Sequence, residues 1–242
     1  MSDQFSQIGT NLMDVRHQID DVIEAVHRIS GSVKLIVVTK GQPVVKMQAL
    51  INSGGLFLGE NYPEETAEKI ESLTGIENIE WHMIGHVQSR KIKYLVKYFD
   101  VIESIESLET AQKVNARFLE SGRKVQILLE VNVSGEVTKQ GFAMSEEQNW
   151  NQMVDVIHAI ELLPALKSTG LMTMPPLGET PESSRKYFIR LRNLLDFVNL
   201  HKQGQPLREL SMGTSFDYKI AIEEGATIVR VGEAIMGARN SS

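Results

Sequence analysis

Cysteine is absent from this chain, the overall charge is not basic, and the apolar runs are short. The lack of cysteine excludes disulfides, thiolate metal ligands, iron–sulfur clusters and a cysteine nucleophile. Runs such as Leu35–Val38 fall well below the roughly 18 consecutive apolar residues of a membrane-spanning helix. Segment 1–21 has neither the basic start nor the apolar core of a secretory signal. We therefore expect a cytoplasmic protein without a membrane partner.

The chain of 242 residues carries 25 Lys and Arg against 31 Asp and Glu, a formal net charge of −6. An acidic balance argues against a nucleic-acid-binding protein, which usually shows a basic stripe. The length suits one large domain or two small ones. No segment rich in proline, glycine and serine divides the chain. We therefore expect residues 1–242 to form a single domain.

The N-terminal segment 1–30 has the apolar spacing of an amphipathic helix. Its apolar residues recur at alternating intervals of four and three, which places them on one face. We expect this helix to pack on its own domain; a dimer seam is the alternative. Ser30–Ser32 then ends the helix. The apolar face comprises Ile8, Leu12, Val15, Ile19, Val22, Val26 and Ile29.

After residue 32, eight short runs of valine, isoleucine and leucine alternate with helix-like segments. Such runs are typical of parallel strands buried on both faces. Eight strand–helix units fit a (β/α)8 TIM barrel, an α/β fold; a doubly wound open sheet is the alternative. The expected strands are 34–39, 56–58, 80–84, 100–102, 125–133, 166–171, 207–210 and 227–231. The expected helices are 43–53, 63–73, 88–98, 107–121, 145–160, 181–201 and 216–224.

Lys40 follows the first of these strands, at the end of the barrel where functional sites lie. A lysine at the mouth of an apolar strand is poorly hydrated. Desolvation lowers the pKa of an amine and leaves it neutral and able to attack a carbonyl. This position indicates Schiff-base chemistry; a lysine that extends to solvent is the alternative.

The segment 211–215 and the end of the last strand provide small residues and hydroxyl groups. Small residues let backbone N–H groups approach an anion, and hydroxyl groups add donors. The loops after the seventh and eighth strands are the usual phosphate site of barrels. We expect a phosphate cradle here; an ordinary strand-to-helix turn is the alternative. The expected members are Ser211, Gly213, Thr214, Ser215 and Gly232.

Arg230 lies within the last expected strand and therefore needs a buried acceptor. A phosphate, a pyridine nitrogen or a carboxylate would serve, and a structural salt bridge is the alternative. His82 and His86 lack a carboxylate at ligand spacing, so we expect no metal site. A lysine, a phosphate cradle and an arginine together indicate an aldehyde that carries a phosphate. Pyridoxal 5′-phosphate fits, as does the sugar-phosphate substrate of a Schiff-base aldolase.

Six stretches, in order along nearly the whole chain, resemble the pyridoxal phosphate homeostasis proteins, the YggS/PROSC family. The last stretch is long and highly specific. The matching stretches are VVTKGQP (37–43), LGENYPEE (58–65), WHMIGHVQSRK (81–91), LLEVNVSGEVTKQGF (128–142), GLMTMPP (170–176) and LSMGTSFDYKIAIEEGATIVRVGEAIMGAR (210–239).

The resemblance implies a single barrel like the N-terminal domain of alanine racemase, the type III fold of pyridoxal phosphate enzymes. It implies pyridoxal 5′-phosphate held as an internal aldimine on Lys40, with Asn61 lining the pocket. The phosphate would lie near the segment 211–215, Arg230 and Gly232. Pyridoxal phosphate is then the ligand, apo-enzymes that accept it are candidate partners, and a monomer is expected.

The resemblance also implies a role in pyridoxal phosphate homeostasis with little or no turnover, and hence no catalytic residue. Racemases of this fold add a second domain, for which this chain leaves no residues. A pyridoxal phosphate-dependent amino-acid racemase or lyase is the alternative. Three positions depart from the usual family pattern, and we expect them to affect the mouth of the pocket: Glu103, His86 and Arg90.

Overall fold

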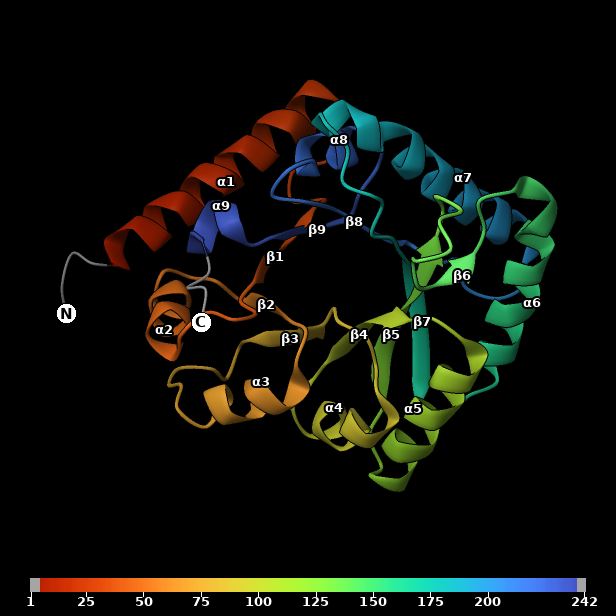
Figure 1. Cartoon of the computed structure of the whole chain (residues 1–242), viewed down its shortest axis with the longest axis horizontal. Helices are drawn as coiled ribbons and strands as arrows, with labels where there is room; N and C mark the ends of the chain where they lie inside the picture. The colour runs from red at the N-terminus through yellow and green to blue at the C-terminus, as the bar shows by residue number, and fades with distance from the viewer. Residues whose placement is uncertain (1–4, 239–242) are drawn as a thin grey trace.

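Eight parallel strands close into a barrel, with helices around the outside, in a computed structural model that describes residues 5–238 (Figure 1). Each strand pairs with the next along the ring, and β9 pairs with β1 to close it. The (β/α)8 prediction is therefore confirmed, and the open sheet is excluded. The ring comprises β1 (Lys34–Val38), β2 (Phe57–Glu60), β3 (Glu80–Met83), β4 (Val101–Ile105), β5 (Val125–Asn132), β7 (Leu166–Met172), β8 (Glu209–Thr214) and β9 (Ile228–Val231).

The helices follow the strands as the sequence indicates, although several begin later than expected. Short 3₁₀ turns stand before three of them: η2 (Ser89–Lys91), η3 (Glu147–Asn149) and η4 (Pro181–Ser184). Among residues 5–238, no helix combines the length and apolar character needed to cross a bilayer. The α-helices are α1 (Ser6–Ala25), α2 (Val44–Asn52), α3 (Pro63–Ile70), α4 (Ile92–Tyr98), α5 (Leu108–Glu120), α6 (Trp150–Glu161), α7 (Arg185–His201), α8 (Tyr218–Glu223) and α9 (Glu233–Met236).

The N-terminal helix α1 lies along the outside of α8 and α9 (Figure 1). Tyr218 Oη donates to Gln18 Oε1 at 2.9 Å, which ties α1 to α8. The helix ends at Ala25, earlier than predicted, and His27 has a left-handed backbone with φ of 56°. Ile29 therefore leaves the apolar face and is 83% exposed. The buried residues of α1 are Ile8, Leu12, Val15, Ile19 and Ile23.

Two strands differ from the sequence prediction where polar residues lie inside the barrel. Strand β8 runs through Thr214, so most of the segment 211–215 is strand rather than loop. Strand β4 continues to Ile105, with a register shift against β5 beyond Ile102. In both cases polar residues follow the apolar run, and Ser211 and Glu103 bond to each other inside the barrel. The two-residue strand β6 (Phe142–Ala143) and helix α9 were not predicted.

Candidate functional site

A cavity of about 580 Å³ opens at the carboxyl ends of the barrel strands. Its walls come from the ends of β1, β2, β3, β5, β7, β8 and β9 and the loops that follow them. The lining residues are Val38, Lys40, Asn61, Ile84, Gly85, His86, Glu130, Gln140, Met174, Leu177, Thr214, Ser215, Phe216, Arg230, Gly232 and Glu233.

The structure brings six of the eight predicted cofactor-binding residues to this cavity. Lys40 lies two residues beyond the end of β1, and Asn61 directly follows β2. The other four come from the last two strands and their loops, on the side where a phosphate cradle was predicted. The six are Lys40, Asn61, Thr214, Ser215, Arg230 and Gly232.

Ser211 and Gly213 do not line the cavity, and each has a structural role in the barrel wall. Ser211 is completely buried and lies below the cavity floor, where its hydroxyl donates to Glu103 Oε2 at 2.6 Å. Gly213 has a φ of +92°, and a Cβ there would lie 2.6 Å from Cβ of Ala221. Gly213 therefore allows α8 to approach the barrel wall closely.

Ser215 gathers backbone donors at one side of the cavity. Its Oγ accepts hydrogen bonds from the N–H groups of Gly232, at 3.1 Å, and Ala234, at 3.4 Å. Thr214 is held next to it, because Asp217 Oδ1 accepts from the N–H of Thr214 at 2.8 Å and from its hydroxyl at 3.1 Å. Backbone amides and hydroxyls that converge in this way can bind an anion.

Arg230 lies on the cavity floor, and its guanidinium is held by Ser211 on β8 and by the two residues that follow β7. It donates to the carbonyl oxygen of Thr173 at 2.8 Å and to Oγ of Ser211. Sδ of Met174 lies 2.9 Å from the same guanidinium. Burial lowers the pKa of Arg230, while the charges of Glu103, Glu130 and Asp217 oppose that shift.

Asn61 presents a buried polar atom that lacks a protein partner. Its Oδ1 makes no hydrogen bond in the described structure, although the residue lines the cavity. Gly85 allows this arrangement, since a Cβ there would lie 2.6 Å from the carbonyl oxygen of Asn61. A buried amide oxygen without a partner is costly, so Oδ1 is a natural contact for a bound molecule.

One charged group on the cavity wall, Glu130, was not singled out from the sequence. Glu130, on β5, has a raised pKa, chiefly because of burial and then because of the charge of Glu106. His86 Nδ1 lies 3.0 Å from Glu106 Oε2 at the mouth. Glu130 could have been found from its place in the apolar run 125–133, where an isolated charge on a buried strand needs an explanation. Met174, Leu177 and Phe216 form the apolar part of the rim.

The three departures from the family pattern do not share one location. Only His86 lies at the mouth of the cavity. Arg90 is exposed on η2. Glu103 is completely buried inside the barrel, because β4 extends past the residue where the sequence pattern ended it. The expectation that all three affect the mouth is therefore wrong for Glu103, and Arg90 does not line the cavity either.

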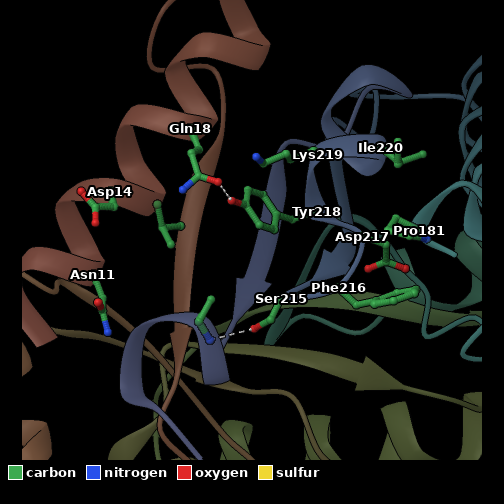
Figure 2. A pocket seen from close by; sticks show the side chains of 12 residues that line it. Asn11, Asp14, Gln18, Pro181, Ser215, Phe216, Asp217, Tyr218, Lys219 and Ile220 are labelled. Atoms are coloured by element: carbon green, nitrogen blue, oxygen red, sulfur yellow. Dashed lines mark hydrogen bonds between the residues drawn. The ribbon is translucent and has the colours of Figure 1, made fainter. Parts of the chain in front are cut away.

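A second cavity, of about 600 Å³, lies behind the loop that carries Ser215 and Phe216. Figure 2 shows it between α1 and α8, with Gln18 bonded to Tyr218 across one wall. Asp14 and Asn11 contribute from α1. Ser215 and Phe216 line both cavities, so the loop that carries them separates the first cavity from the N-terminal helix. Within residues 5–238, no group of histidines and carboxylates is arranged to hold a metal ion.

Comparison with known proteins gives consistent matches over nearly the full length. Residues 11–240 match the alanine racemase N-terminal domain. The pyridoxal phosphate homeostasis protein of Aquifex aeolicus is 37% identical over 228 residues, which cover 94% of this chain and 96% of that protein. The structure of PipY from Synechococcus elongatus with pyridoxal phosphate bound is 28% identical, with a TM-score of 0.79, covering 95% of this chain and all of that one.

A more distant match adds information about the fold alone. An alanine racemase of Clostridium difficile is 19% identical, with a TM-score of 0.69. The match covers 98% of this chain but 58% of the racemase chain. The barrel is therefore the shared part, and the remainder of the racemase has no counterpart in it.

Proposed function

We propose a function from one premise: the chain belongs to the pyridoxal phosphate homeostasis family and has its alanine racemase N-terminal domain. The protein binds pyridoxal 5′-phosphate and takes part in the homeostasis of this cofactor. The cofactor is linked covalently to Lys40, and the protein catalyses little or no turnover. The observation that carries this proposal is that Lys40 and a set of anion donors face one cavity.

The residues of the cavity fit the chemical groups of pyridoxal phosphate. When bound, pyridoxal phosphate supplies an aldehyde that condenses with a primary amine and releases water. Lys40 supplies that amine. The hydroxyl of Ser215, beside Thr214, and the N–H groups of Gly232 and Ala234 that meet at it would supply donors for the phosphate. Asn61 Oδ1 supplies an acceptor that has no partner within the described structure.

Arg230 suits the ring end of the cofactor rather than the phosphate. Its guanidinium is held by Thr173, Ser211 and Met174, whereas the anion donors gather around Ser215 and Gly232. A guanidinium keeps its own protons and donates to a neighbouring nitrogen, so it favours an unprotonated pyridine nitrogen. An unprotonated ring withdraws electrons weakly, which supports low turnover.

Several finer expectations belong to the same proposal. Residues 1–242 act as one cofactor-binding domain, with the segment 1–30 packed on the barrel. The protein acts in the cytoplasm as a monomer and passes pyridoxal phosphate to apo-enzymes that accept it. The rim is open to solvent at Leu177, which is 80% exposed, so transfer to another protein does not require the barrel to open.

The visible absorption spectrum of the protein incubated with pyridoxal phosphate tests the proposal. We expect a yellow band in the wild type and its loss in Lys40→Ala. Lys113→Ala is the matched control, because Lys113 pairs with Glu109 on the surface of α5 and does not line the cavity. A wild-type protein that stays colourless would contradict the proposal. Rapid exchange of the Cα proton of added amino acids would favour a racemase or lyase instead.

A further inference from the structure

The inner face of the barrel wall carries a row of contacting polar side chains, which we call the inner chain. It begins at the amino-terminal end of the strands with Lys34, whose Nζ lies 2.6 Å from Glu80 Oε1. It ends at the cavity floor with Arg230. Charged residues in a barrel interior are expensive to bury unless each is paired. The members are Lys34, Glu80, His82, Glu103, Ser211 and Arg230.

His82 is the middle of the inner chain and must carry a positive charge there. Its Nε2 lies 2.8 Å from Glu80 Oε1, and its Nδ1 lies 2.7 Å from Glu103 Oε1. A neutral imidazole has one donor and one acceptor, whereas an ionised carboxylate only accepts. Both contacts are therefore hydrogen bonds only when both ring nitrogens carry protons. Burial alone would lower the pKa of His82, but bonds to Glu103 and Glu80 raise it overall.

The charges of the inner chain therefore alternate in sign. Lys34, His82 and Arg230 are cations, and Glu80 and Glu103 stand between them as anions. Glu103 is completely buried, and burial would raise its pKa, but the bond and charge of His82 and the charge of Arg230 lower it. Each interior charge thus has opposite charges on both sides, and the last cation faces the cavity.

Ser211 connects Glu103 to Arg230. Its hydroxyl donates to Glu103 Oε2 at 2.6 Å and accepts from the Arg230 guanidinium. The direct distance from Arg230 Nη1 to Glu103 Oε2 is 3.9 Å, so the hydroxyl is the shorter link. The other charges that act on Arg230 are Glu130, on the cavity wall, and Asp217, after β8.

We propose that Glu103 is a positioning residue, which, through Ser211, holds the guanidinium of Arg230 in the orientation that faces the ring nitrogen of bound pyridoxal phosphate. This inference rests on the proposed function, because it assigns the ring end of the cofactor to Arg230. The other contacts of the guanidinium, the carbonyl of Thr173 and Sδ of Met174, fix it on the side of β7. Glu103 and Ser211 fix it from below.

Two nuclear magnetic resonance measurements test the proposal, one without and one with cofactor. The first titrates His82 in unloaded protein labelled with ¹⁵N-histidine, with the signal assigned by its loss in His82→Gln. The second measures the ring nitrogen of ¹⁵N-labelled pyridoxal phosphate bound to the protein.

Three variants should give three different patterns. In Glu103→Gln we expect the titration midpoint of His82 to fall by roughly 1–3 pH units, since it loses a charged partner. The ring nitrogen should also become more protonated, because Arg230 loses its anchor. In Ser211→Ala the ring nitrogen should change in the same direction while His82 titrates as in the wild type. In Glu60→Gln, which alters a glutamate buried outside the barrel, neither signal should move.

The outcomes separate this inference from the proposed function. A wild type that takes up no pyridoxal phosphate contradicts the proposed function, and with it the role of Arg230 toward the ring. A loaded Ser211→Ala protein with an unchanged ring nitrogen overturns the positioning role alone. A titration midpoint of His82 at or below the ordinary histidine value of 6.5 in the wild type overturns the charged inner chain. If Glu103→Gln does not fold, Ser211→Ala still decides the matter, because it keeps every charge.

Discussion

Glu103 and Glu60 are both completely buried, yet they lie on opposite faces of the barrel wall and their pKa values shift in opposite directions. Glu103 faces inward and bonds to His82 and Ser211 through both carboxylate oxygens. Glu60 faces outward, toward Lys69 on α3. Neither side chain is exposed to solvent, so the partners determine the direction in which each pKa shifts.

The outer cluster around Glu60 is less complete than the inner chain. Glu60 Oε1 accepts from the hydroxyl of Thr39 at 2.8 Å and from Lys69 Nζ at 3.3 Å, while Oε2 has no partner in the described structure. Lys69 lies closer to Glu65, at 2.6 Å. Burial therefore dominates and raises the pKa of Glu60, although Lys69 and Thr39 oppose it.

Removing each carboxylate should give the largest difference in the free energy of unfolding between the two sites. Glu103→Ala leaves His82, Ser211 and Arg230 buried without their shared anion, and we expect a loss of about 3–5 kcal/mol. Glu60→Ala should lose about 1–3 kcal/mol, because Lys69 keeps Glu65. Urea unfolding of the cofactor-free proteins measures both. Equal losses would show that the inner chain is not the better-paired of the two.

Replacing one hydroxyl on each face of the barrel wall should lower the free energy of unfolding by a smaller amount, again with the larger loss on the inner face. Ser211→Ala removes a partner from both Glu103 and Arg230, and we expect a loss of about 1–3 kcal/mol. Thr39→Val removes one donor from Glu60, whose charge is already weakly supported, and should lose about 1 kcal/mol. The same unfolding measurement decides. A larger loss in Thr39→Val would contradict the expected order.

The fold was predictable because nearly every strand of the barrel is a continuous apolar run. Five of the six predicted residues that line the cavity were found from the rule that sites lie at strand ends, which needs only the strand boundaries. The sixth, Asn61, came from the family resemblance. Ser211 was also recognised as important, but its location was not. Serine and glycine after Leu210 suggested a loop, whereas β8 continues there because Ser211 has buried partners.

The inner chain could not be derived from the sequence, for a physical reason. Its members come from β1, β3, β4, β8 and β9 and meet only when the barrel closes. Whether Glu103 faces inward depends on the extra length and register shift of β4, which no apolar pattern records. The sequence could show that Glu103 was unusual. Its partners had to come from the structure.

The smallest expected effect is a difference in pH dependence, and its sign distinguishes the two glutamates. The ordinary pKa of either group is 4.5. Above that value the unfolded chain releases the Glu60 proton while the folded protein retains it, so wild-type stability falls as pH rises toward the folded pKa. The pH dependence from Glu103 has the opposite sign. Its contribution to stability is present above pH 4.5 and is lost as pH falls through its lowered pKa.

The free energies of unfolding of the wild type, Glu60→Gln and Glu103→Gln, measured in urea between about pH 3 and 6, should therefore diverge, by at most about 1.4 kcal/mol for each unit of pKa shift. Relative to the wild type, Glu60→Gln should gain stability as pH rises above 4.5, and Glu103→Gln should gain stability as pH falls below 4.5. His82 has a raised pKa, so its contribution is fully present below its ordinary value of 6.5 and is lost only at higher pH. The window therefore excludes its titration in the wild type. If both variants drifted in the same direction, burial alone would set the charge of these glutamates, and the inner chain would not be a set of paired ions.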